Sequence, residues 1–221
     1  YNSDLIGGRW ATDTGPRAGV YYRRSTNGGS SFGTPLRLNP STQHASRGVI
    51  AASGSKVYGL YVTQTKWVRY SKTAPRVIYT RANANYGAGA WGTARRLTSL
   101  TGRVDYPSLA AYGSVVYVAY TDAATGGVKI AISRNGGSKF STKGLGSTTN
   151  TISDGKAGLP SVSVYGSLVV VAWTADAHGK VVAKVSRDAG KTWAGNTLAT
   201  TAQGYATTHV AGGRLSVAWP T

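Results

Sequence analysis

Three near-copies of one eight-residue sequence constrain the fold of this chain more than any other feature. They are STNGGSSF (25–32), SRNGGSKF (133–140) and SRDAGKTW (186–193). Each copy has the pattern S-x-D/N-x-G-x-x-W/F, which we call a box. A short Asn or Asp side chain accepts hydrogen bonds from backbone N–H groups of a tight turn, and glycine takes a positive φ without strain. We therefore interpret each box as a turn that joins two β-strands.

The repeated residues of the boxes are predicted to be structural. The Asn or Asp and the Gly clamp the turn, and the aromatic ring folds back into the sheet as an anchor. These residues are Asn27, Gly29 and Phe32, then Asn135, Gly137 and Phe140, and finally Asp188, Gly190 and Trp193. A catalytic role for Asp188 is the less favoured alternative. A fourth, degenerate copy is expected in TRANANYGAGAW (80–91), which ends in Trp but lacks the Asp.

The sequence around each box predicts four strands per repeat. The box at 133–140, for example, follows YPSLAAYG (106–113), VVYVAYTD (115–122) and GGVKIAI (126–132), and a short polar strand comes after it. Repeats of four strands with a period of roughly 50 residues are typical of β-propellers. The spacings between boxes, measured round the chain, add up to all 221 residues.

We therefore expect one all-β domain over residues 1–221, a propeller of four-stranded antiparallel blades. Four blades fit the length, with the N- and C-terminal strands completing one blade together and protecting both edges. One difficulty is that GRWATD (8–13) also resembles a second strand, so the terminal blade has more candidate strands than places.

The box resembles the Asp-box, or BNR, repeat of sialidase-like β-propellers. This resemblance implies the fold and a box face that lies away from the active site, but it implies no particular activity. Sialidases of this kind use an arginine triad, a Tyr and Glu nucleophile pair and an acid Asp. The chain contains no Glu, and its nearest match to the family's F/Y-R-I-P motif is GGRW (7–10). The resemblance therefore supports the fold and argues against sialidase activity.

The strand order also predicts which residues share a face. In an antiparallel blade, the turns between strands one and two and between strands three and four lie on the box side, and the other links lie on the opposite side. Five of the seven Asp residues are expected on that opposite face: Asp13, Asp105, Asp122, Asp154 and Asp176. They form either a cluster for acid–base chemistry or calcium binding, or ordinary turns, and the second interpretation is favoured. Asp105 is the least turn-like and the best candidate acid.

Basic and aromatic residues are expected on the same face. The longest link, 62–76, presents cations beside aromatic rings, an arrangement suited to sugar stacking or to carboxylate or phosphate capture. Its candidate ligand-binding residues are Lys66, Trp67, Arg69 and Tyr70. The candidates at the entrances of inner strands or in the neighbouring links are His44, Arg47, Arg103, Tyr106, Lys156 and His178, of which His178 also fits an ordinary turn.

The net charge of +18 favours an anionic polymer as partner. An acidic polysaccharide or anionic cell-surface glycan is expected, with non-specific nucleic-acid binding as a side effect of a charge spread around the body. The chain begins at Tyr1 and has no apolar run of membrane-spanning length, so we expect a secreted protein without membrane insertion. No cofactor is expected unless calcium binds the carboxylates.

Two functions follow from these residues. The first is a carbohydrate-binding, lectin-like propeller that holds its ligand on the face opposite the boxes. The alternative is an enzyme acting on acidic polysaccharide, either a lyase or a glycoside hydrolase. In a lyase, Arg47 and Arg103 would neutralise a uronate carboxylate while Tyr106 or His44 acts as the base. In the weaker hydrolase variant, Asp105 would work with a second Asp of that face.

Overall fold

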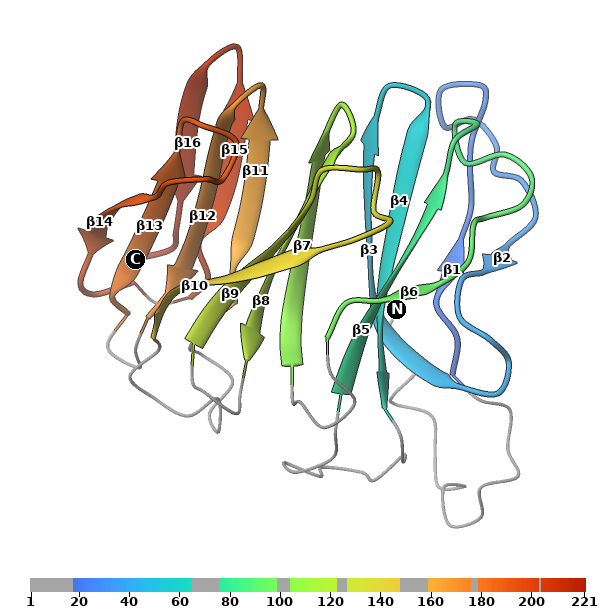
Figure 1. The fold of residues 1–221 in the computed structure, drawn as a ribbon, viewed down its shortest axis with the longest axis horizontal. Helices are drawn as coiled ribbons and strands as arrows, with labels where there is room; N and C mark the ends of the chain where they lie inside the picture. Colours follow the sequence, from blue (N-terminus) through green and yellow to red (C-terminus); the bar gives the residue numbers. More distant parts are fainter. Residues whose placement is uncertain are drawn as a thin grey trace.

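The computed structural model describes residues 18–64, 76–98, 104–122, 127–147, 159–175, 179–202 and 204–221. These ranges form an all-β structure of three four-stranded antiparallel sheets with a two-stranded sheet at either end of the row (Figure 1). We call the four-stranded sheets the first, second and third blades, and the two-stranded sheets the N- and C-terminal half-blades. Within the described ranges, no helix has the length and apolar character that crossing a bilayer requires.

Each blade is a simple antiparallel meander. The N-terminal half-blade consists of β1 (Tyr21–Tyr22) and β2 (Leu36–Arg37). The first blade consists of β3 (His44–Ser53), β4 (Lys56–Gln64), β5 (Arg76–Asn83) and β6 (Arg95–Arg96). The second consists of β7 (Val104–Tyr112), β8 (Val115–Asp122), β9 (Gly127–Ser133) and β10 (Ser141–Ser147). The third consists of β11 (Ser161–Tyr165), β12 (Leu168–Thr174), β13 (Val181–Ser186) and β14 (Ala194–Ala199). The C-terminal half-blade consists of β15 (Thr207–Ala211) and β16 (Arg214–Ala218).

Burial explains the composition of the strands. The second strands of the blades, such as β8 and β12, are buried along most of their length because neighbouring blades cover both faces of the sheet. They consequently read as nearly continuous apolar runs. The outermost strand β14 is almost entirely exposed and carries small and polar residues. Burial is therefore greatest in the second strands, whereas the innermost strands β11 and β15 are only partly buried. The polar strand after the box is the one that the repeats predict.

Among the described residues, four separate apolar clusters hold the row together, one at each junction between neighbouring sheets. Trp91 packs with residues of the N-terminal half-blade, and Tyr58 packs with residues of the second blade. Trp173 lies in the cluster between the second and third blades, and Val210 lies in the cluster between the third blade and the C-terminal half-blade. Every sheet is therefore anchored by its neighbours rather than by one central core.

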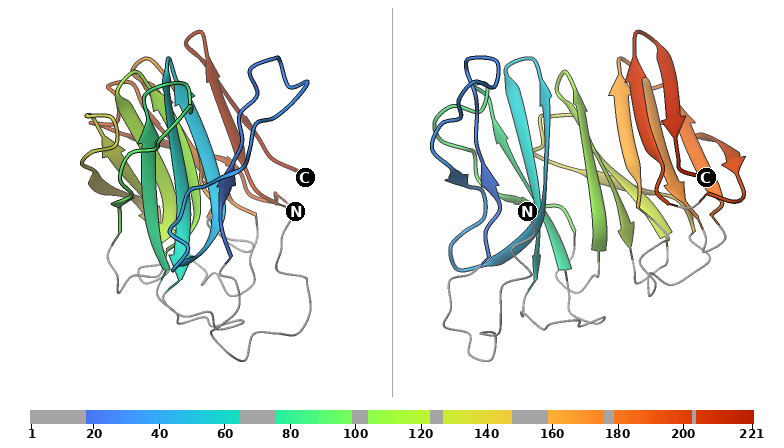
Figure 2. Two further views of the ribbon diagram at one scale, coloured as in Figure 1. Left: turned by 90° about the vertical axis from the view of Figure 1, so that its right-hand side faces the viewer. Right: turned by 180° about the vertical axis from the view of Figure 1, so that it is seen from behind.

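The two half-blades do not form the closing blade that the sequence predicts. They are separate sheets at opposite ends of the row (Figures 1 and 2). Each is held at its end by its own apolar contacts, such as the edge-to-face contact of Tyr22 with Trp91, whose ring centres lie 5.1 Å apart. The segment 8–13, which competes for a place in the terminal blade, lies outside the described residues.

Backbone hydrogen bonds show which turns share a face. In each full blade the box loop donates to a carbonyl in the turn between strands one and two. The bonds are Tyr86 N to Ser55 O at 2.6 Å, Gly136 N to Ser114 O at 2.8 Å and Ala189 N to Ser167 O at 2.9 Å. The starts of β3, β7 and β11 lie at the other ends of these strands, so they form an opposite rim, at the bottom of Figure 1.

Candidate anion-binding site

The three box turns have the same hydrogen bonds. In each, the Ser hydroxyl accepts the amide of the Gly four residues later at 2.7–2.9 Å. The hydroxyl donates to the side-chain oxygen of the Asn or Asp two residues later, also at 2.7–2.9 Å. That oxygen then accepts the amide of the residue four positions further on at 2.9–3.0 Å. The second and third turns join strands three and four of their blades, where the sequence predicts them, and the first joins the two strands of the N-terminal half-blade.

Asp188 uses its carboxylate entirely within its own turn. Its oxygens accept the Thr192 hydroxyl at 2.6 Å, the Thr192 amide at 2.9 Å and the Ser186 hydroxyl at 2.7 Å. These hydrogen bonds, that from the Thr192 hydroxyl above all, hold the pKa of Asp188 well below its usual range. A carboxylate engaged in this way favours the structural interpretation over a catalytic one.

The degenerate box is organised by Asn83, which the sequence analysis did not single out. Asn83 Oδ1 accepts the amides of Asn85 at 2.8 Å and Gly87 at 2.9 Å, two and four residues later. The Ser hydroxyl accepts the same two amides in the other boxes. Asn83 Nδ2 also donates to the carbonyls of Ala88 and Ala90, which ties down the longer loop. Asn83 ends β5 and stands two residues before Asn85, as the Ser stands two residues before the Asn or Asp in the other boxes. This spacing is the signal that could have located the turn.

Phe32 does not have its predicted anchoring role. Its ring is 57% exposed, whereas Trp91 is buried and Phe140 and Trp193 pack against the cores at their junctions. The other three rings lie against the preceding sheet of the row. The N-terminal half-blade has no preceding sheet among the described residues, so the Phe32 ring has nothing to pack on.

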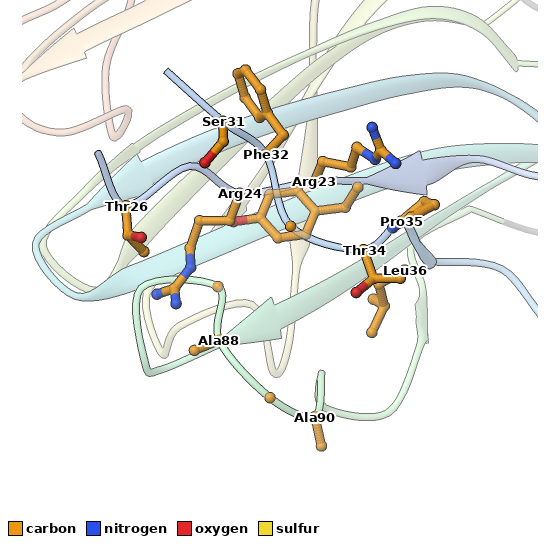
Figure 3. A pocket seen from close by; sticks show the side chains of 14 residues that line it. Arg23, Arg24, Thr26, Ser31, Phe32, Thr34, Pro35, Leu36, Ala88 and Ala90 are labelled. Carbon is orange, nitrogen blue, oxygen red and sulfur yellow. The ribbon is translucent and has the colours of Figure 1, made fainter. Parts of the chain in front are cut away.

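Phe32 instead lines a hollow of about 740 Å³ on the box face, between the first box turn and the loop 87–90. Arg24 extends across this hollow toward Ala88, while the Phe32 ring points away from Ala88 and Ala90 (Figure 3).

On the opposite rim, two inner strands carry the same irregularity. β3 and β7 pack side by side, and each has a bulge near its start, between Ser46 and Val49 and between Asp105 and Ser108. Arg47 and Tyr106 lie inside these bulges with φ values of 53° and 49°. A left-handed conformation costs a non-glycine residue roughly 1–3 kcal/mol and persists where the surroundings enforce it. Bulges redirect side chains, and these two direct Arg47 and Tyr106 toward each other.

Asp105 is the centre of the resulting cluster. Its side chain is only 2% exposed, and Arg47 Nε lies 2.9 Å from its Oδ1. Arg76, at the start of β5, donates from Nη1 to its Oδ2. The guanidinium carbon of Arg47 lies 4.4 Å from the centre of the Tyr106 ring, a cation–π distance. Three strands of two blades therefore converge on one buried carboxylate.

The cluster is better suited to binding an anion than to transferring a proton. Two guanidinium groups face one carboxylate, so the three side chains carry a net charge of about +1. Oδ2 of Asp105 accepts a hydrogen bond from Arg76, and Oδ1 is ion-paired with Arg47 without a hydrogen bond. This pairing with two arginines favours an anchoring role over the predicted role as acid. Arg47 is 36% exposed, and its terminal nitrogens have no hydrogen-bond partner among the described residues. They can therefore reach a carboxylate, sulfate or phosphate.

His44 lies at the start of β3, three residues before Arg47, and is buried. Its Nδ1 accepts the amide of Ala18 at 3.3 Å, and Ala45 N donates to Ala18 O at 3.0 Å. A neutral His44 consequently carries its proton on Nε2. These bonds connect the start of β3 to the segment before β1, so His44 has a structural role in positioning the N-terminal half-blade.

The structure brings together Arg47, Asp105 and Tyr106, and it adds Arg76, which the sequence analysis missed. Arg76 pairs with Gln64, which in turn pairs with His44, so its position depends on strand pairing across the blade. The remaining candidates lie outside the described residues: Lys66, Trp67, Arg69, Tyr70, Arg103, Lys156 and His178.

The acidic cluster finds no support in the described part of the chain. Asp122 forms an ion pair with Lys129 rather than joining Asp105. The other acids expected on this rim, Asp13, Asp154 and Asp176, lie outside the described residues. Across the described ranges, no three His, Asp or Glu side chains gather in a way that could hold a metal ion.

Comparison with known proteins identifies the fold alone. No protein-family model and no curated protein matches the chain. Among solved structures it is similar to Trypanosoma rangeli sialidase, with a TM-score of 0.57 and 17% identity over 91% of this chain. It is also similar to the GH43 endo-arabinanase of Bacillus licheniformis, with a TM-score of 0.51 and 12% identity over 86% of this chain. The fold is thus that of sialidase-like propellers.

The chain is shorter than these neighbours. It spans 39% of the sialidase chain and 75% of the endo-arabinanase chain. At such low identity the neighbours' activities are not transferred to this protein, because unrelated activities share one fold.

Proposed function

We propose that this protein is a secreted carbohydrate-binding propeller that recognises an acidic glycan or another anionic polymer through the rim opposite the boxes. The observation that carries the proposal is the geometry of Arg47. Asp105 and the Tyr106 ring fix its guanidinium, while its terminal nitrogens have no hydrogen-bond partner among the described residues. The four turns then serve as Asp-box repeats that stiffen the opposite face.

Fixing Arg47 in advance makes it an effective anion receptor. A guanidinium forms two parallel hydrogen bonds to a carboxylate or sulfate, and these are stronger when the side chain is already ordered. Arg76, whose side chain is 17% exposed, adds a second positive charge at the same carboxylate. The net charge of +18 draws a polyanion toward the protein before the specific contacts form.

Binding assays with a matched pair of variants test this proposal. The probes are heparin, a polyuronate and a neutral arabinan, measured by calorimetry at about 0.15 M salt. Arg47→Gln is expected to weaken binding of the acidic polymers about tenfold or more, since a charge-assisted hydrogen bond is worth about 1.5–3 kcal/mol. The control, Arg95→Gln, removes the same charge from an exposed residue of β6 and should retain most of the affinity. Equal losses in the two variants would show that only the overall charge matters.

A second candidate is a lyase acting on acidic polysaccharide. The observation that favours it is the contact between Arg47 and Tyr106, which puts a carboxylate-neutralising cation beside a phenol that could move a proton. The propeller neighbours are glycan-acting enzymes, which agrees with this alternative without establishing it. Incubation with polyuronate should release a product that absorbs as an unsaturated uronate, and Tyr106→Phe should abolish its release. Unchanged polymer, or full activity of the Tyr106→Phe variant, would contradict the lyase assignment, and carbohydrate binding would remain as the proposed function.

A further inference from the structure

The box turns make one set of contacts at three of the four junctions of the row. A box glycine packs against an aromatic side chain of the preceding sheet. A Cβ at Gly87 would overlap Tyr22 Oη, and a Cβ at Gly137 would lie 3.8 Å from the Tyr58 ring. At Gly190 a Cβ would lie 3.5 Å from the Tyr117 ring. The box thus connects adjacent sheets as well as two strands of its own sheet.

Arginines add a second contact of this kind. Arg24 of the N-terminal half-blade donates from Nη1 to Tyr86 O in the box of the first blade at 3.4 Å. Arg134 of the second blade donates from Nη2 to Ala189 O in the box of the third blade at 2.9 Å. At two junctions, an arginine near one box therefore bonds to the backbone of the next box along the row.

These contacts are unmatched at the two ends of the row. A Cβ at Gly29 would have no atom within 4 Å, and Phe32 is 57% exposed. At the other end, Arg187 occupies the same box position as Arg134 and is exposed, with no described box beyond it. Among the described strands, β1 pairs with β2 alone and β16 pairs with β15 alone. One end therefore presents strands three and four of a blade, and the other presents strands one and two.

We propose that these ends join between two copies of the chain. β1 of one copy pairs with β16 of another, and the two half-blades form one four-stranded blade. An exposed strand edge is a ready template for such pairing, because its N–H and C=O groups lack partners. In the joined blade, Phe32 and Gly29 of one copy pack on the third blade of the other, and Arg187 reaches the box turn near Gly28. This contact is head-to-tail, so it produces a closed ring or a longer chain of copies.

Salt separates this association from the glycan binding proposed above. Two copies that each carry +18 repel, so added salt should strengthen their association by screening that repulsion. Binding of an anionic polymer should weaken with salt instead, because it depends on attraction between opposite charges. Failure of one proposal therefore leaves the other intact.

Cross-linking tests the proposed junction directly, because the 221-residue sequence contains no cysteine. Arg24→Cys is introduced in one preparation and Ser216→Cys in a second, because the register shared by the three blades places positions 24 and 216 opposite each other in the joined blade. The two preparations are then mixed with a short bis-maleimide. A covalent dimer containing one copy of each variant is expected. The control pairs Tyr112→Cys, exposed in β7, with Ser216→Cys and should give no such dimer. Absence of the mixed dimer overturns the proposal, and so does a chain with both cysteines that cross-links only within itself.

A second pair of variants measures the contribution of the Phe32 contact to association without a cross-linker. Phe32→Asp should raise the dissociation constant tenfold or more in sedimentation at about 0.5 M salt. The side chain is exposed in the single copy, so this variant should keep the unfolding midpoint of the natural chain. Tyr165→Asp, at a site 47% exposed at the end of β11, is the matched control and should associate like the natural chain. A monomer under all salt conditions, or equal behaviour of the two variants, contradicts the proposal.

Discussion

The guanidinium carbon of Arg47 lies 4.4 Å from the centre of the Tyr106 ring, although the two residues belong to different blades. Both have a positive φ, and both lie in a bulge of an inner strand. Neither backbone conformation is favourable by itself for these residue types. The contact therefore depends on Asp105, whose Oδ1 lies 2.9 Å from Arg47 Nε and holds the guanidinium in place.

Replacing Asp105 should destabilise the protein. Asp105→Asn keeps the shape of the side chain but leaves Arg47 and Arg76 facing each other without a counter-charge. We expect a loss of about 3 kcal/mol in the free energy of unfolding, measured with urea, because the lost charge is buried. Asp122→Asn is the control, since its partner Lys129 is 30% exposed, and it should cost about 1 kcal/mol or less. Similar losses would mean that the two ion pairs contribute alike.

The pH dependence of stability should include a contribution from Asp188. Hydrogen bonds from Thr192 and Ser186 lower its pKa in the folded state below the unfolded value of 3.8. The folded state then binds fewer protons than the unfolded state, so this stabilisation is present above pH 3.8 and is lost as the pH falls below it. Asp188→Asn puts at this position the residue type that the other two boxes have. The free energy of unfolding of this variant should depend less on pH between about pH 4 and 2. Identical acid unfolding curves for the two proteins would contradict this assignment.

Alanine substitutions at two glycines of one loop should distinguish the energetic cost of steric overlap from the cost of backbone strain. Gly87 and Gly89 both have a positive φ, 79° and 65° respectively. A Cβ at Gly87 would overlap Tyr22, whereas a Cβ at Gly89 would meet nothing within 4 Å. Gly89→Ala should cost about 1 kcal/mol from strain alone, and Gly87→Ala about 1–3 kcal/mol more. Thermal unfolding of both variants gives the difference, and equal midpoints would show that Tyr22 moves aside freely.

The phenylalanines of two boxes should respond differently to truncation. Phe140 packs against the core between the first and second blades, so Phe140→Ala should cost about 2 kcal/mol or more. Phe32→Ala should change the unfolding free energy of a single copy by less than about 0.5 kcal/mol, because the ring is exposed. The measurement is urea unfolding at low protein concentration, where association is weak. A large loss for Phe32→Ala would mean that its ring is covered within one chain.

Much of the architecture is predictable from the sequence because the boxes are local. A Ser, an Asn or Asp and a Gly within five residues fix their own turn through short hydrogen bonds, so the pattern alone locates strands three and four. The role of Asn83 was not predicted, because its residue type differs from the Ser of the other boxes. Its amide oxygen nevertheless accepts hydrogen bonds in the place of the serine hydroxyl.

The candidate site was only partly predictable, because it depends on contacts between distant strands. Asp105, Arg47 and Tyr106 stand at strand starts on the rim that strand order identifies. Arg76 reaches Asp105 from β5 of the neighbouring blade, which no local pattern indicates. The described sheets also form an open row, although the evenly spaced repeats suggest a ring, because closure depends on how the end sheets pack.

The division of the interior into four junction clusters has a consequence for how the protein comes apart. Each cluster couples a sheet only to its immediate neighbours, as in linear repeat proteins. Opening should therefore begin at the two half-blades, each of which has a single junction, and spread inward. Amide hydrogen exchange would then be fastest in β1 and β16 and slowest in β8, giving a gradient of protection along the row.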